Sequence, residues 1–74
     1  MNTITKTVRD KINEEYHKFF IDNPGDIPDY LILDRESYSL LKESMNIPAY
    51  EDIADFQGFI IHIKPLEKNY VKFL

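Results

Sequence analysis

The sequence contains no cysteine and no tryptophan, and only two of its 74 residues are glycine. Without cysteine, the chain has neither a disulfide nor a thiolate metal site to stabilise so small a fold. Gly25 and Gly58 stand alone, so no glycine-rich loop is available to hold a phosphate group. These absences exclude a disulfide scaffold and a phosphate-binding loop, and the lack of cysteine fits a reducing compartment.

An excess of basic residues is also missing: nine Lys and Arg face thirteen Asp and Glu, for a formal net charge of −4. Nucleic-acid binding draws on a basic surface that releases counterions from phosphate groups, so we expect no direct nucleic-acid binding. No apolar run approaches the roughly 20 residues that cross a bilayer. The first residues lack the basic-then-apolar pattern of a signal peptide, so we expect a cytoplasmic protein with no membrane contact.

A helical pattern opens the sequence. Between Thr3 and Ile21 apolar residues recur at spacings of three and four, which is typical of an amphipathic helix. We expect Thr3 to cap this helix and the turn at residues 23–26, with its Pro-Gly centre suited to type II, to end it. The apolar stripe consists of Ile4, Val8, Ile12, Tyr16, Phe19 and Phe20.

The next segment, residues 29–48, carries signals for a strand, a helix cap, a helix and a stop. Asp29–Leu33 has no polar residue after Asp29 and reads as a strand buried on both faces. Asp34 is placed to cap the helix that follows. Asn46 suits the left-handed position after the helix, and Pro48 prevents the helix from continuing. The apolar face of this helix would be Tyr38, Leu41 and Met45.

The C-terminal third predicts two strands. Residues 49–56 are compatible with one helical turn or with an irregular loop, whereas residues 59–64 alternate in polarity as a strand does. Residues 70–74 read as a last strand that pairs back in a hairpin and places Lys72 on a sheet edge. The whole chain, 1–74, therefore predicts a single α+β domain of order α-β-α-β-β. Its two helices pack on one face of a three-stranded sheet that ends in a C-terminal β-hairpin.

Two histidines are the candidates for catalysis or metal binding. His17 shares a helix face with Glu14, which is half of the paired Glu-x-x-His motif of di-iron bundles; the second half is missing, and a solvent-exposed helix face explains the pair. His62 lies on the wetter side of its strand and would need a partner supplied by the fold. The acidic residues lack calcium-loop spacing. We expect no enzymatic activity, no cofactor and no metal, and keep an enzyme or metal protein built on His62 or His17 as the last alternative.

Aromatic residues are abundant, with five Tyr and five Phe. A tyrosine can bury its ring and keep its hydroxyl in water, and such residues anchor interfaces, although a small core filled by large side chains is the simpler explanation. We expect a non-enzymatic protein-interaction or self-assembling module that binds another protein or forms a homo-oligomer. The alternative is a small acidic inhibitor of a host enzyme, such as a nuclease or polymerase, that uses Asp52 and Asp55. The candidate protein-binding residues are Tyr16, Phe20, Tyr30, Tyr50, Asp52, Asp55 and Tyr70.

Two segments, residues 27–42 (IPDYLILDRESYSLLK) and 56–63 (FQGFIIHI), resemble a known pattern. They are similar to a strand-helix-strand arrangement in major capsid proteins of HK97-type tailed phages, in which a strand ending in a polar residue leads into a short helix and a later glycine begins a second strand. The resemblance covers about half of the chain and implies a shared local architecture, with no catalytic residues. The abundance of residues with AT-rich codons, such as Ile, Lys and Asn, also favours a phage or a low-GC bacterium as the source.

Overall fold

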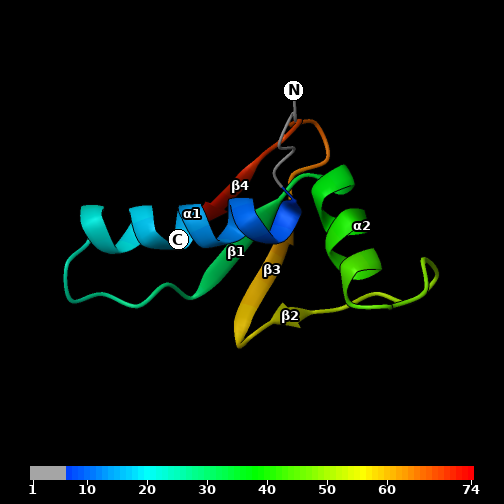
Figure 1. The fold of residues 1–74 in the computed structure, drawn as a ribbon, viewed down its shortest axis with the longest axis horizontal. Coiled ribbons are helices and arrows are strands. Elements are labelled where there is room, and N and C mark those ends of the chain that lie inside the picture. Colours follow the sequence, from blue (N-terminus) through cyan, green and yellow to red (C-terminus); the bar gives the residue numbers. More distant parts are fainter. Residues whose placement is uncertain (1–6) are drawn as a thin grey trace, which may run out of the picture.

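The fold is that of a computed structural model, which describes residues 7–74. These residues form a small α+β domain with a four-stranded mixed sheet of order β2-β3-β1-β4. The elements in chain order are α1 (Val8–Asp22), β1 (Tyr30–Leu33), α2 (Arg35–Ser44), β2 (Asp55–Phe56), β3 (Phe59–Ile63) and β4 (Val71–Phe73). Figure 1 shows α1 crossing the sheet with its N-terminal end next to α2, where Arg9 donates to the Ser44 hydroxyl over 3.1 Å.

The first helix begins later than the sequence predicts. Thr7 is its N-cap, because the Thr7 hydroxyl accepts from the Asp10 N–H (3.1 Å) and the Thr7 N–H donates to the Asp10 carboxylate (3.3 Å). This reciprocal pair is a capping box. The expected cap, Thr3, lies outside the described residues. The predicted turn after α1 is confirmed, with a hydrogen bond of 3.1 Å from the Asp26 N–H to the Asn23 carbonyl and a φ of 86° at Gly25.

The second helix ends as predicted. Asn46 adopts the left-handed conformation with a φ of 58°. The Asn46 N–H donates to the Glu43 carbonyl (3.1 Å) and the Ile47 N–H to the Lys42 carbonyl (2.9 Å), which together make a Schellman motif. Pro48 follows directly, so the local sequence alone accounts for the end of α2.

The start of α2 is also as predicted, with Asp34 as its N-cap. The buried Asp34 carboxylate accepts from the Ser37 N–H (3.4 Å) and from the Tyr70 N–H (3.1 Å), which precedes β4. Burial raises the pKa of Asp34, but the hydrogen bonds from Ser37 and Tyr70 outweigh burial and lower this pKa below its ordinary value of 3.8. One carboxylate therefore joins the second helix to the last strand.

The sheet differs from the prediction in its connectivity. β1 pairs in parallel with β3 (Leu31 with Ile61) and antiparallel with β4 (Leu31 with Phe73). The predicted C-terminal hairpin is therefore wrong, because β4 lies on the other side of β1 from β3. Buried residues at three of its four positions make β1 the strand best suited to a central position.

The hairpin that does form lies between β2 and β3, which makes the sheet four-stranded rather than three-stranded. Phe56 pairs with Phe59, so Gln57 and Gly58 make a two-residue loop. Their φ angles of 52° and 88° are both positive, as a type I′ hairpin turn requires. The ambiguous stretch at residues 49–56 is thus a loop that leads into the short strand β2.

Both helices pack on the same face of the sheet, as predicted. Leu31 and Leu33 point to one side of β1, and Ile12 of α1 and Leu41 of α2 pack with them in a single core cluster. The buried members of this cluster are Ile12, Leu31, Leu33, Leu41, Phe56, Val71 and Phe73. Within the described part of the chain, the opposite face of the sheet is left without a helix.

Candidate functional site: the open face of the sheet

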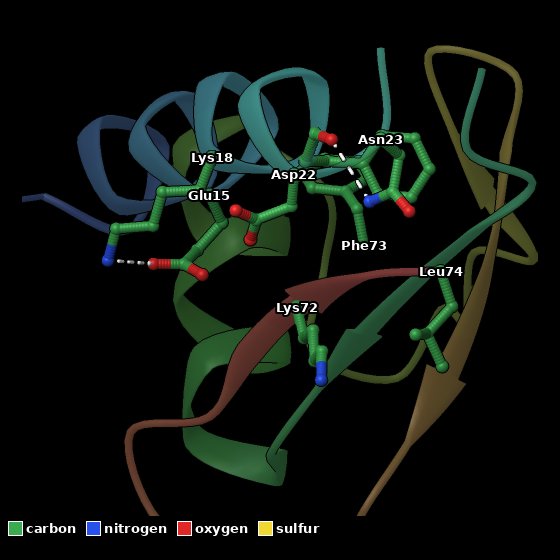
Figure 2. Close-up of a pocket in the computed structure, with 8 residues that line it drawn as sticks. Glu15, Lys18, Asp22, Asn23, Lys72, Phe73 and Leu74 are labelled. Atoms are coloured by element: carbon green, nitrogen blue, oxygen red, sulfur yellow. Dashed lines mark hydrogen bonds and ion pairs between the residues drawn. The ribbon is translucent and has the colours of Figure 1, made fainter. Parts of the chain in front are cut away.

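The face of the sheet that points away from the helices is the candidate functional surface. Side chains alternate along a strand, so Tyr30 and Ile32 point away from the helices on which Leu31 and Leu33 pack. Figure 2 shows the same alternation at the end of β4, where Phe73 points toward α1 and the adjacent residues, Lys72 and Leu74, point away from α1. Strand register extends this surface across the sheet. We call it the open face; it consists of Tyr30, Ile32, Asp55, Ile60, His62, Lys72 and Leu74.

These side chains lie in two rows that run across the strands. In the first row, Ile60 pairs with Asp55 on one side and with Tyr30 on the other. Tyr30 also exchanges both backbone hydrogen bonds with Leu74 (2.9 and 3.0 Å). The second row has Ile32 at its centre. From the β2 side to the β4 side, the rows read Asp55, Ile60, Tyr30, Leu74 and then His62, Ile32, Lys72.

Apolar groups are accessible on the first row. The exposed fractions are 38% for Tyr30, 49% for Ile60 and 53% for Leu74, whereas Ile32 in the second row is only 7% exposed. Ile32 lies between His62 and Lys72 in register, and these longer side chains flank it. A shallow hollow of about 360 Å³ is lined by Tyr30, Ile32, His62, Ile63, Lys64 and Leu74. Contiguous exposed apolar side chains of this kind are typical of contact surfaces.

The open face also carries charge of both signs at its two edges. Asp55 lies on β2 and Lys72 on β4, which are the outermost strands of the sheet. Both residues are exposed, and neither has a salt bridge with another residue in the range 7–74. The face is therefore polarised, acidic at one edge and basic at the other, with the apolar groups between them.

Of the predicted protein-binding residues, Tyr30 and Asp55 lie on the open face. The Tyr30 ring lies 5.0 Å from the His62 ring. Tyr70 precedes β4, and the Lys64 ammonium group lies over its ring at 5.0 Å. This cation–π contact leaves Tyr70 half-buried near one end of the sheet.

The structure places Tyr16 and Phe20 on the opposite, helical side of the sheet. Tyr16 packs edge-on against Phe20 (4.7 Å between ring centroids) and Phe73 (5.3 Å), and it also contacts Phe59 (5.6 Å). The Tyr16, Phe59 and Phe73 rings belong to the core cluster or pack against it, whereas Phe20 is 37% exposed. Large aromatic side chains used for core packing account for Tyr16 without an interface.

Tyr50 and Asp52 lie in the loop between α2 and β2, apart from both groups. The buried Lys42 side chain holds this loop, donating to the Ala49 carbonyl (3.1 Å) and the Glu51 carbonyl (2.9 Å). The Lys42 ammonium group is also 3.7 Å from the Asp52 carboxylate. Asp52 and Asp55 thus belong to different elements, and the acidic-inhibitor function that rests on them stays a prediction.

The two histidines lie on opposite sides of the sheet and both are exposed. His17 lies on α1, where its ring is 6.5 Å from the Tyr16 ring, and His62 lies on the open face. Among residues 7–74, no three His, Asp or Glu side chains gather in a way that could hold a metal ion. A catalytic or metal-binding role of either histidine stays a prediction without a supporting cluster.

A second hollow, of about 470 Å³, lies between α1 and β4 (Figure 2). Glu15 and Lys18 pair across 3.0 Å, and the hydrogen bond to Glu15 raises the pKa of Lys18. The Asn23 amide is already bonded to the Phe19 carbonyl (3.1 Å). Four charged residues line the hollow: Glu15, Lys18, Asp22 and Lys72. Glu15 and Lys18 pair with each other and Lys72 points away from α1, so these four residues do not form a cluster of like charge.

Four open-face residues were missed as site residues by sequence reasoning: Ile32, Ile60, Lys72 and Leu74. The signal for Ile60 was present, since it is an apolar residue at a position where the alternation of β3 calls for a polar one. Leu74 became part of the surface only because β4 pairs with β1, which places it beside Tyr30. The local sequence pattern cannot predict this pairing, because the two strands are far apart in the sequence.

No helix within residues 7–74 combines the length and the apolar character needed to cross a bilayer. Comparison with protein-family models, with curated proteins and with solved structures finds no match to this chain. The resemblance to phage capsid proteins therefore stays a prediction, and the geometry of the open face is the basis on which a function can be inferred.

Proposed function

We propose that the protein is a protein-interaction module whose contact surface is the open face of its sheet. The observation that carries this proposal is the row of Ile60, Tyr30 and Leu74, three partly exposed apolar side chains on a face that neither helix of residues 7–74 covers. Covering them with another polypeptide removes apolar surface from water, which is the main driving force of protein association. A half-exposed tyrosine at the centre supplies the kind of anchor that interfaces favour.

A short chain has particular reason to use such a surface. Small domains bury a smaller fraction of their surface than large ones, so apolar residues on a second sheet face add little to stability unless a partner covers them. In antiparallel and mixed sheets with one solvated face, that face is usually polar. Apolar residues at its centre are therefore better explained by contact than by folding.

The test compares three versions of the chain: wild type, Ile60→Glu on the open face and Ile21→Glu near the end of α1. Both substituted residues are exposed isoleucines, so both variants should fold. Each version is measured by size exclusion with light scattering and by affinity capture from cells that naturally produce the protein. We expect wild type and Ile21→Glu to associate, with themselves or with another protein, and Ile60→Glu to lose that association.

Two outcomes would overturn this function. One is a wild-type chain that remains a monomer at high concentration and retains no protein. The other is an association that Ile60→Glu leaves intact, because the contact surface would then lie elsewhere on the molecule.

A further inference from the structure

We infer that the occupant of the open face is a second copy of this chain, in a two-fold symmetric dimer whose sheets stack face to face. The β2 edge of one protomer lies over the β4 edge of the other. This inference rests on the proposed function and adds to it the identity and orientation of the partner.

The charges at the sheet edges select this partner. Asp55 and Lys72 occupy opposite outer strands of the same face. A two-fold axis that runs between the stacked sheets, parallel to the strands, exchanges the two edges. It brings Asp55 of each protomer toward Lys72 of the other, so two ion pairs form by symmetry. The surface is thus complementary to itself, which is the requirement of an isologous interface.

The spacing of these groups fits the arrangement. Asp55 lies in the first row of the open face and Lys72 in the second, an offset of two residues or about 6.6 Å along the strands. A lysine ammonium group on its flexible four-carbon stem can span such an offset. Neither side chain has to leave an ion pair within the described chain, because neither makes one.

The same axis covers the apolar row. It places β3 of one protomer over β1 of the other, so that Ile60 lies over Tyr30 of the second copy. Packed sheets lie about 10 Å apart, a distance that side chains of this size fill from both sides. The three partly exposed apolar groups of each protomer then become the centre of the interface, and the charged groups form its rim.

The other face-to-face orientation is disfavoured by the same charges. A two-fold axis perpendicular to the strands would lay β4 over β4 and β2 over β2. Lys72 of one protomer would then face Lys72 of the other, and the two Asp55 side chains would face each other. Opposed like charges of this kind exclude a wrong register.

The interface is small, so the dimer must be weak. The strands have two to five residues, which gives the open face about 220 Å² by strand spacing and rise, against about 800 Å² per partner in a standard interface. We therefore expect a concentration-dependent equilibrium between monomer and dimer rather than a permanent dimer.

The test is analytical ultracentrifugation of the full chain with paired charge reversals. Asp55→Lys and Lys72→Asp should each weaken the dimer about tenfold or more, because each places like charges opposite one another twice. The double variant Asp55→Lys/Lys72→Asp restores opposite charges and should recover most of the affinity. The matched controls are Asp26→Lys for Asp55→Lys and Lys68→Asp for Lys72→Asp; each makes the same change of net charge at an exposed turn residue and should dimerise like wild type. Circular dichroism of each variant verifies the fold.

The inference is overturned if wild type sediments as a monomer at millimolar concentration, if the single reversals leave the dimer unchanged, or if the double variant fails to recover. These failures are distinguishable from failure of the proposed function. A monomeric chain that still captures another protein through Ile60 would retain the function and exclude only the second copy as partner.

Discussion

Individual polar side chains connect elements that are distant in the sequence. Asp34 caps α2 and holds the chain just before β4 through the Tyr70 N–H. Because hydrogen bonds lower its pKa in the folded state, the unfolded chain binds more protons than the folded chain in the range just below pH 3.8. The stabilisation from Asp34 is therefore complete above that range and is lost as the pH falls through the folded-state pKa.

Replacing Asp34 should destabilise the fold in a graded and pH-dependent way. Asp34→Ala removes both acceptors and leaves two backbone N–H groups unpaired, at a cost of about 2–3 kcal/mol. Asp34→Asn keeps one acceptor oxygen and should cost about half as much. Urea unfolding at neutral pH measures both, and a series down to about pH 2 should show the difference between wild type and Asp34→Asn shrinking with the pH. A constant difference would show that the carboxylate charge adds nothing.

Lys42 is a second residue that stabilises another segment of the chain, the loop between α2 and β2. Its ammonium group donates to two loop carbonyls and lies 4.8 Å from the Tyr38 ring. Lysine is rarely buried, and the helical spacing in the sequence places Lys42 on a helix face without showing what it contacts.

Lys42→Met keeps the apolar stem and removes the donors. We expect a loss of about 1–2 kcal/mol of unfolding free energy, since hydrogen bonds from a charged donor are lost while the freed carbonyls can bond to water. Amide exchange in residues 49–54 should become faster, with little change in β1. Lys68→Met, in the exposed turn before β4, is the control and should have neither effect. Unchanged exchange in the loop after Lys42→Met would refute this role.

At the scale of elements, the turn between β2 and β3 is built with one residue poorly suited to it. Gln57 has a φ of 52°, a region in which side chains other than Asn and Asp are strained. Gly58 has a φ of 88°, and a Cβ atom added there would meet no atom within 4 Å. Glycine is therefore needed at this position for its backbone conformation and not for lack of space.

Gln57→Asn should therefore stabilise the protein by about 0.5 kcal/mol, because Asn-Gly is the preferred pair in this turn. Gly58→Ala should destabilise it by about 1 kcal/mol. Gln57→Ala is the control and should be nearly neutral, since alanine meets the same backbone strain. Thermal unfolding of the three variants measures the order of their stabilities. A Gly58→Ala variant more stable than wild type would contradict the assigned turn.

Local signals predicted the elements better than their pairing. The capping position of Asp34 and the left-handed Asn46 were readable because each acts within a few residues. β2 was missed because two residues are too few for a period, and Gln-Gly is a weaker hairpin signal than Asn-Gly. The last strand was paired with the wrong neighbour because sequence proximity favoured β3. A fully apolar β1 already indicated a central strand with a neighbour on each side.

At the scale of the whole molecule, the two faces of the sheet have different roles. One face packs against both helices and contains the core. The other carries Tyr30, Ile60 and Leu74, and no helix in the described part of the chain lies over them. The sequence could predict Tyr30 as a contact residue from its amphipathic chemistry. It could not predict the companions of Tyr30, because the row exists only after β3 and β4 have paired on either side of β1.

Site-specific photo-crosslinking in cells that naturally produce the protein tests the central claim most directly. A photoreactive amino acid replaces Ile60 on the open face or, as a control, the more exposed Leu66 in the turn before β4. We predict a discrete crosslinked product from position 60, to a second copy or to another protein, and none from position 66. No product from position 60, or equal products from both positions, would contradict the open face as the contact surface.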